Sequence, residues 1–169
     1  MAASPPAPAL GIASPVLALS KAAWRLGISL SRLDRDTGVV DHMIKSLAEE
    51  IKSLGNQCDL VYAELEEVTG KAGTDSLPPY DLDGRMWNHL NLQANEASRT
   101  MRDLERFFQT VREAHFSPTF ESQRQNKPEG AMSQITSFKT RVCRHTDNLH
   151  TALLVVKTLV LLLLESRQS

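Results

Sequence analysis

Apolar side chains recur along this chain with the period of an α-helix. From Val40 onward they follow one another at alternating steps of four and three residues: Val40, Ile44, Leu47, Ile51, Leu54, Cys58, Val61, Leu65 and Val68. This heptad spacing places all of them on one face of a helix, which can be buried against neighbouring helices. Gly70 then stands where a glycine often ends a helix. The pattern predicts a helix over 41–69.

Two later stretches repeat the pattern. The first comprises Met86, Leu90, Ala94, Ala97, Met101, Leu104, Phe108, Val111 and His115. Pro118 places its end near His115 or Phe116, since the residue before a proline avoids the helical conformation. The second comprises Ile135, Phe138, Val142, His145, Leu149, Ala152, Val156, Leu159 and Leu163. It predicts a helix over about 130–165.

An earlier helix is indicated before these three. Ser14 is a suitable N-cap, and Pro15 suits the first helical position because proline has no N–H to offer. We expect this helix to run to about Leu33. The residues that share its apolar face are Leu19, Ala23, Leu26 and Leu30.

The segments between these helices oppose regular structure. Residues 35–39 form a short turn containing Gly38, and 70–82 and 117–129 are longer loops with glycines or prolines. No strand-like alternation is present. Because 169 residues suit one domain, we predict an all-α fold: an elongated antiparallel four-helix bundle. It spans 14–165, after a flexible Pro/Ala-rich N-terminus (1–13) and before a polar tail (166–169).

The first helix also carries a basic stripe. On a helical wheel, Lys21, Arg25 and Arg32 lie within about 40° of one another, opposite the apolar face. Leu17, Trp24 and Ile28 project beside or within that stripe. These six residues form a candidate membrane or partner face. Alternatively, Trp24 and Ile28 pack under another helix while the basic groups pair with the acidic second helix.

Charge and motifs restrict the function further. The net charge is −1, unlike that of a dedicated nucleic-acid binder. The second helix is acidic and the outer segments are basic, which suggests complementary neighbours, or lipid or partner binding. Loops that cradle phosphates and common hydrolase motifs are missing. We therefore expect no catalytic residue, no cofactor and no small-molecule substrate. A small-molecule or metal-binding bundle with enzymatic activity is the alternative.

Cysteine and histidine are the remaining candidates for chemistry. Cys143, His145 and His150 could be metal ligands, but on one helix His145 points away from the other two. We expect His145 to be a core histidine. Cys58 lies within the heptad face, where it acts as a small apolar residue, and we expect no metal site.

The termini bear on localisation. Residues 1–20 contain no Lys or Arg, unlike a secretory signal peptide. The apolar run Ala152–Leu164 includes Lys157 and is shorter than the roughly 20 residues that cross a bilayer, so we interpret it as a core helix. We expect a cytoplasmic protein that is not secreted, with peripheral membrane contact as an option.

The order of elements resembles the helical N-terminal domain of fungal STAND-type, NLR-like proteins, the HeLo-like family. That family includes the N-terminal domain named after azaphilone pigments biosynthesis cluster protein L. The segments that carry the resemblance are IASPVLALSKAAWRL (12–26), MIKSLAEEIKSL (43–54) and RVCRHTDNLHTAL (141–153). In the last, His145, Leu149 and Leu153 fall as in the family's final helix.

The resemblance implies a signalling or effector bundle. Related domains are associated with programmed cell death through membrane disruption by the first helix. We therefore expect a non-enzymatic interaction domain that acts through a protein partner or self-association, with an anionic membrane surface as a further partner.

Overall fold

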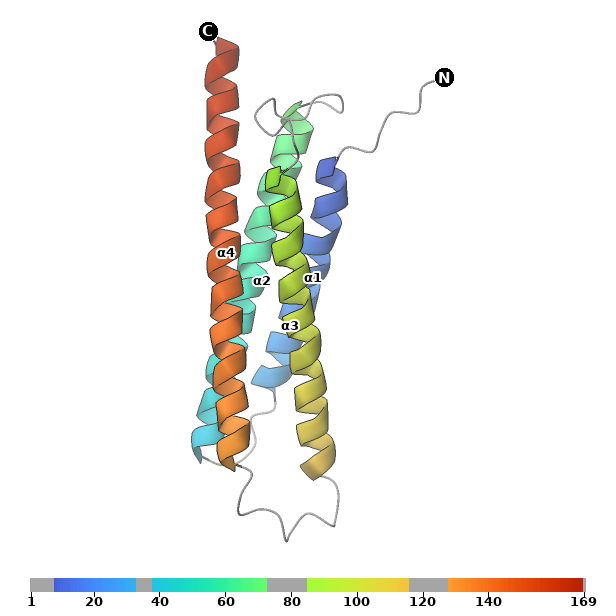
Figure 1. The fold of residues 1–169 in the computed structure, drawn as a ribbon, viewed down its shortest axis with the longest axis vertical. Coiled ribbons are helices and arrows are strands. Elements are labelled where there is room, and N and C mark those ends of the chain that lie inside the picture. Colours follow the sequence, from blue (N-terminus) through green and yellow to red (C-terminus); the bar gives the residue numbers. More distant parts are fainter. Residues whose placement is uncertain (1–7, 33–37, 73–84, 116–127, 169) are drawn as a thin grey trace, which may run out of the picture.

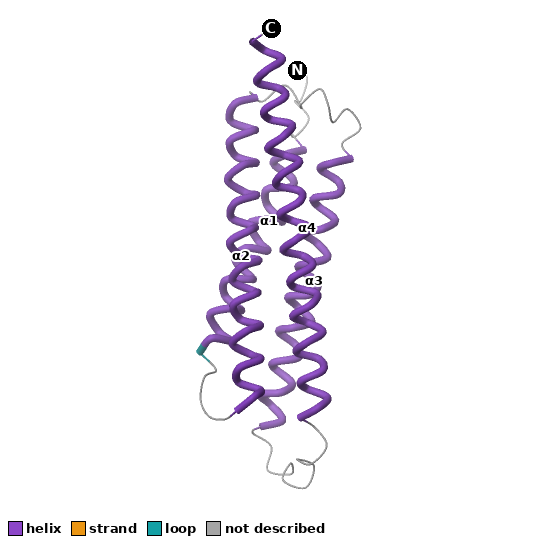
Figure 2. The backbone as a smooth tube through the Cα atoms, turned by 90° about the vertical axis from the view of Figure 1, so that its left-hand side faces the viewer, coloured by secondary structure: helices purple, strands orange, loops and turns teal. Residues whose placement is uncertain are grey.

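The computed structural model describes residues 8–32, 38–72, 85–115 and 128–168, and apart from Arg32 all of them lie in four α-helices (Figure 1). These are α1 (Pro8–Ser31), α2 (Gly38–Ala72), α3 (Arg85–His115) and α4 (Pro128–Gln168). The predicted all-α class is confirmed. At 1.5 Å per residue α4 is about 60 Å long, and the bundle is elongated, as Figure 2 shows.

The predicted start of the first helix is wrong. α1 begins at Pro8, and Pro15 lies inside it. Pro8 thus holds the first helical position, where a missing N–H costs nothing. Because Pro15 has no N–H either, the carbonyl of Gly11 lacks its usual bond within the helix. Burial of the residues that follow Pro15 outweighs that local cost.

Other predicted boundaries also differ. α2 begins at Gly38 and continues to Ala72, so Gly38 is not in a turn and Gly70 does not end the helix. α4 begins at Pro128, again with proline at the first position, and continues through 166–168. Only the end of α3 at His115 falls where Pro118 predicts it. The rest of the predicted N-terminal segment, turn and loops (1–7, 35–37, 73–82, 117–127) lies outside the described residues.

The helices occupy four corners in the order α1, α2, α4, α3. The principal contacts join α1 to α2, α2 to α4, α1 to α3, and α3 to α4. In Figure 1 the chain direction alternates from each helix to the next. Consequently α2 and α4 are parallel neighbours, whereas the consecutive helices α2 and α3 lie at opposite corners. The predicted arrangement of antiparallel neighbours thus describes only two of the four contacts, α1 with α2 and α3 with α4.

The predicted apolar faces form the core. The buried residues common to the patterns are Leu19, Ala23, Leu26, Leu30, Leu47, Ile51, Leu54, Cys58, Val61, Leu65, Leu90, Ala94, Ala97, Met101, Leu104, Ile135, Val142, Leu149 and Val156. Partly buried residues pack against this core: Ile44, Phe108, Phe138 and Ala152. The side chains of the remaining predicted positions, except His145 and Val111, lie outside the described residues. The heptad pattern therefore identifies the core correctly.

Two glycines allow helices α1 and α2 to pack closely against each other. A Cβ atom on Gly27 would lie 2.9 Å from Cγ of Lys52, and one on Gly55 would lie 3.1 Å from the ring of Trp24. Side-chain carbons do not normally approach so closely. These two glycines let the helices pack tightly and give Trp24 a place against α2.

Candidate functional site

The basic stripe of α1 lies on the surface of the bundle. Lys21, Arg25 and Arg32 are exposed, and Ile28 between them is 41% exposed. Leu17 is only half-buried. The structure therefore leaves four of the six predicted face residues exposed and Leu17 half-buried, opposite the buried leucines of the same helix.

Trp24, the sixth residue of the predicted face, is engaged within the bundle. Its indole Nε1–H donates to Oδ2 of Asp59 at 2.9 Å, and its ring rests against Gly55. Oδ1 of the same carboxylate accepts a hydrogen bond from the buried hydroxyl of Ser20. Asp59 thus joins two consecutive turns of α1 to α2, and the indole is not free to insert into another surface.

The charged groups pair across different corners from those expected. Arg25 pairs at 2.8 Å with Glu105 of α3 rather than with the acidic α2. The basic partner of α2 is instead α4, where Lys157 lies 3.1 Å from Glu64 and Lys139 lies 3.9 Å from Glu50. The complementary charge seen in the sequence therefore lies mainly between the parallel neighbours α2 and α4. Exposed pairs of this kind contribute little stability.

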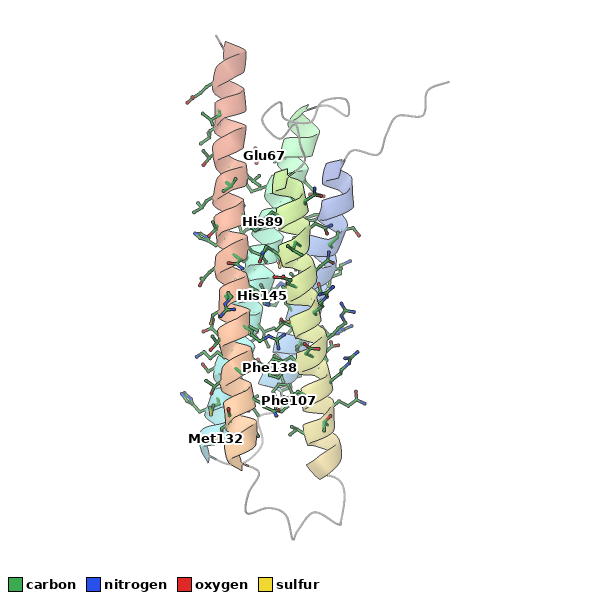
Figure 3. All side chains as sticks on the ribbon, viewed as in Figure 1. Glu67, His89, Phe107, Met132, Phe138 and His145 are labelled. Atoms are coloured by element: carbon green, nitrogen blue, oxygen red, sulfur yellow. The ribbon has the colours of Figure 1, made fainter. Side chains whose placement is uncertain are left out.

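His145 is a core histidine, as predicted, and is hydrogen-bonded across the α3–α4 contact (Figure 3). Its Nε2 lies 2.8 Å from Oγ1 of Thr100, which also accepts from Arg141 and lies within hydrogen-bonding distance of the backbone carbonyl of Glu96. The hydroxyl has one hydrogen, so it can donate either to Glu96 or to Nε2 of His145, and the tautomer of the ring decides which. Its Nδ1 is buried without a partner. Burial, followed by the charge of Arg141, lowers the pKa of His145, so the ring is neutral near pH 7.

A shallow groove of about 310 Å³ lies beside this histidine. It is lined by Glu96, Arg99, Thr100, Asp103, Arg141, Arg144, His145 and Asn148. Arg141 is already bound to Asp103 at 3.3 Å, and Nε2 of His145 is already hydrogen-bonded to Thr100. The groove can hold a charged group, but its histidine is poorly placed to exchange a proton with a solvent-borne substrate.

The two cysteines have different surroundings. Cys58 is buried, and desolvation, with a smaller effect from Asp59, raises the pKa of its thiol to about 12. Cys143 is half-buried, and burial followed by a hydrogen bond with Glu50 raises the pKa of its thiol. Since the thiolate is the reactive form, both thiols are poor nucleophiles.

The candidate metal ligands do not converge. His145 is buried towards α3, Cys143 is half-buried and His150 is exposed. Among the described residues, no three His, Cys, Asp or Glu side chains are grouped as metal ligands would be. In the same part of the chain, none of the helices combines the length and hydropathy needed to cross a bilayer.

The C-terminal half of α4 is apolar on two sides. Leu149, Leu153 and Val156 are buried. On the opposite side, large apolar side chains are 44–61% exposed: Leu154, Val155, Leu161 and Leu162. On a helical wheel these four lie within about 120° of one another. The interpretation of the run Ala152–Leu164 as a core helix is thus only partly correct, because four of its seven described apolar side chains are exposed.

Two exposed leucines flank this surface on the neighbouring helices. Lys139 bonds to Ser46 and Lys157 pairs with Glu64, in both cases 93 residues apart. This register sets Leu60, which is 53% exposed, level with Leu153, the residue before Leu154. On α3, Leu92 is 52% exposed and adjoins Gln93, which bonds to Asn148 of α4. We call the set Leu60, Leu92, Leu154, Val155, Leu161 and Leu162 the α4 face.

The heptad pattern alone does not identify the α4 face. It assigned the apolar positions of the last helix to a single buried seam, yet the four exposed residues of α4 all lie off that seam. A helix that is apolar all round needs cover on both sides. The surplus of apolar residues outside the seam is the feature of the sequence that could have indicated the α4 face.

No protein-family model matches the chain, and no curated protein or solved structure is similar enough to count as a match.

Proposed function

We propose that this chain is a non-enzymatic helical interaction domain that binds another polypeptide through the α4 face. The observation that carries the proposal is the concentration of exposed apolar side chains there. Of the seven large apolar residues that are exposed among the described ones, six belong to this face and the seventh is Ile28 of α1. Monomeric soluble proteins rarely leave apolar patches of more than a few hundred Å² open to water.

The shape of the surface favours a polypeptide over a small molecule. Small ligands bind in concave, mostly apolar pockets, whereas the α4 face lies along the outer side of a helix. In Figures 1 and 2 the C-terminal end of α4 also projects beyond the ends of the other helices. An amphipathic helix or a second bundle can cover such a surface. A signalling role, which the resemblance to HeLo-like domains implies, is compatible with this mode of action.

Site-specific photo-crosslinking tests the proposal. A photoreactive amino acid replaces Leu161 in the chain expressed in its own cells, and the matched control carries it at Ile28, which is also apolar and exposed. We expect a crosslinked polypeptide from position 161 and not from position 28. If position 161 and a second position on the α4 face, Leu154, give no crosslinked polypeptide, the proposal is wrong.

The α1 stripe supports a second candidate function, contact with an anionic membrane surface. Lys21, Arg25 and Arg32 are exposed beside the partly exposed Ile28. Each basic residue near an anionic membrane contributes about 1 kcal/mol, so three give about 100-fold in affinity. The engagement of Trp24 with Asp59 removes the largest apolar group from this face.

Vesicle sedimentation tests the membrane candidate. Salt-sensitive binding to anionic vesicles should fall when Lys21, Arg25 and Arg32 become Gln, and neutral vesicles should not bind. Equal sedimentation of the protein with both vesicle types, or with neither, would exclude this use of the stripe.

A further inference from the structure

The exposed side of α4 has its own helical seam, separate from the buried one. Its exposed positions Thr151, Leu154, Thr158, Leu161 and Glu165 follow at steps of three and four residues. Val155 and Leu162 lie beside this line and are also exposed. Such spacing is that of a coiled-coil contact. A partner with one long helix of the same spacing would therefore fit it.

We infer that the partner is a second copy of this chain, with the two α4 helices packed antiparallel about a two-fold axis near Thr158. The inference rests on the proposed function and names its partner. In that arrangement Leu154 of each copy lies against Leu161 of the other. Val155 of each lies against Leu162 of the other. The four exposed apolar side chains described on α4 are then each matched by an apolar side chain of the other copy, as a self-complementary two-fold interface requires.

The two copies of α4 cover four of the six residues of the α4 face directly. Leu60 and Leu92 are exposed on the neighbouring helices α2 and α3, so they lie outside the contact between the two α4 helices.

The area sets the strength of the association. Together the six side chains of the α4 face leave on the order of 600 Å² of apolar surface open, and the four on α4 itself about two thirds of that, compared with about 800 Å² per partner in an interface of standard size. Polar neighbours such as Thr151 and Thr158 add to the contact. We therefore expect a reversible dimer with a dissociation constant in the micromolar range rather than a permanent one.

The charges near the face favour protein over lipid. Helices that lie on anionic membranes carry Lys and Arg along the border of their apolar side. From Thr151 onward α4 has two basic residues, Lys157 and Arg167. Lys157 is paired with Glu64 of α2, and Arg167 stands at the end of the helix, beyond the four exposed apolar residues. A lipid surface would find little positive charge here, whereas a second α4 does not need it.

Sedimentation equilibrium of the purified full chain tests the pairing, at concentrations from about one to several hundred micromolar. The wild type should change from monomer to dimer in this range. Leu154→Glu or Leu161→Glu should weaken the dimer at least tenfold, and Ile28→Glu, which places the same charge on α1, should leave it unchanged. Circular dichroism of each variant checks that it is folded.

A short thiol-specific crosslinker tests the orientation, with Cys143→Ser as background because Cys58 is buried. Thr158→Cys should link two copies, whereas Thr151→Cys should not, since antiparallel pairing separates the two copies of position 151 by about 20 Å at 1.5 Å per residue. Links at both positions would overturn the antiparallel arrangement.

Two results would overturn the inference altogether. One is a wild-type chain that is monomeric at every concentration, and the other is a dimer that Leu161→Glu and Ile28→Glu weaken equally. Neither overturns the proposed function, which fails only if neither position 161 nor position 154 captures a polypeptide in cells.

Discussion

Replacement of Asp59 by Ala should measurably loosen the contact between α1 and α2. The carboxylate accepts hydrogen bonds from both the Ser20 hydroxyl and the Trp24 indole. Its removal leaves the buried Ser20 without its acceptor, whereas the indole N–H, which lies nearer to solvent, can turn to water. The two losses are therefore unequal.

The magnitude follows from these surroundings. A hydrogen bond to a charged group contributes about 1.5–3 kcal/mol, and an unpaired buried donor costs about 1–3 kcal/mol. Because Asp59 is exposed, both the contribution of its hydrogen bonds and the cost of losing them lie near the lower ends of these ranges. The Ser20 hydroxyl can also donate instead to a backbone carbonyl of its own helix. We expect a loss of about 2 kcal/mol in the free energy of unfolding, or about 4–8 °C in Tm for a chain of this size.

The matched control is Asn56→Ala on the exposed side of the same helix. Asp and Asn have similar helix propensities, so the difference between the two variants isolates the contacts of Asp59. Urea unfolding followed by circular dichroism gives both free energies. A double-mutant cycle with Trp24→Phe, which keeps the ring but removes the N–H, should show a coupling of about 1 kcal/mol. The reasoning is refuted if Asp59→Ala is as stable as Asn56→Ala.

Three further results are expected. Gln57→Met should raise the free energy of unfolding by about 1 kcal/mol in urea titrations, because Nε2 of Gln57 is buried without a partner; a less stable variant would contradict this. The lowered pKa of His145 means that the unfolded chain binds its proton more readily, so stability should fall as pH drops below about 6.5. His145→Gln should flatten that slope in urea titrations at several pH values, and an unchanged slope would exclude His145 as its source. The Cys58 thiol, with a pKa of about 12, should react with a thiol reagent at pH 8 only after unfolding, whereas its labelling in the native protein at the rate of Cys143 would show that the core opens.

Sequence patterns predicted the core better than the ends of the helices. The spacing from Leu47 to Leu65 suffices to identify buried residues, because only one face of a long helix can be covered by its neighbours. Boundaries at Ser14, Gly38 and Gly70 were wrong, since local preferences of about 1 kcal/mol are overridden by packing of the adjoining turns. Pro128 shows that the same residue can end a loop or begin a helix.

The candidate surfaces depended on which helices are neighbours, and that cannot be deduced from one helix at a time. Arg25 was expected to meet the acidic second helix, but the corner order brings it to Glu105 of α3. The sequence leaves two placements open for Trp24, on an exposed face or packed under another helix, and the structure holds it against α2 through Asp59. The exposed Leu154 and Leu161 were counted as core because apolar content alone does not tell which side of a helix is covered.

The corner order also has a consequence for how the chain folds. Side-chain hydrogen bonds between α1 and α2 join residues as close as 35 apart in sequence, and those between α3 and α4 join residues 38 to 55 apart. By contrast, Arg25 and Glu105 are 80 apart, and Ser46 and Lys139 are 93 apart. Closing a longer chain segment costs more entropy, so two helical hairpins should form first and dock afterwards. The parallel contacts between α2 and α4 would then form late, and weakening them should speed unfolding more than it slows folding.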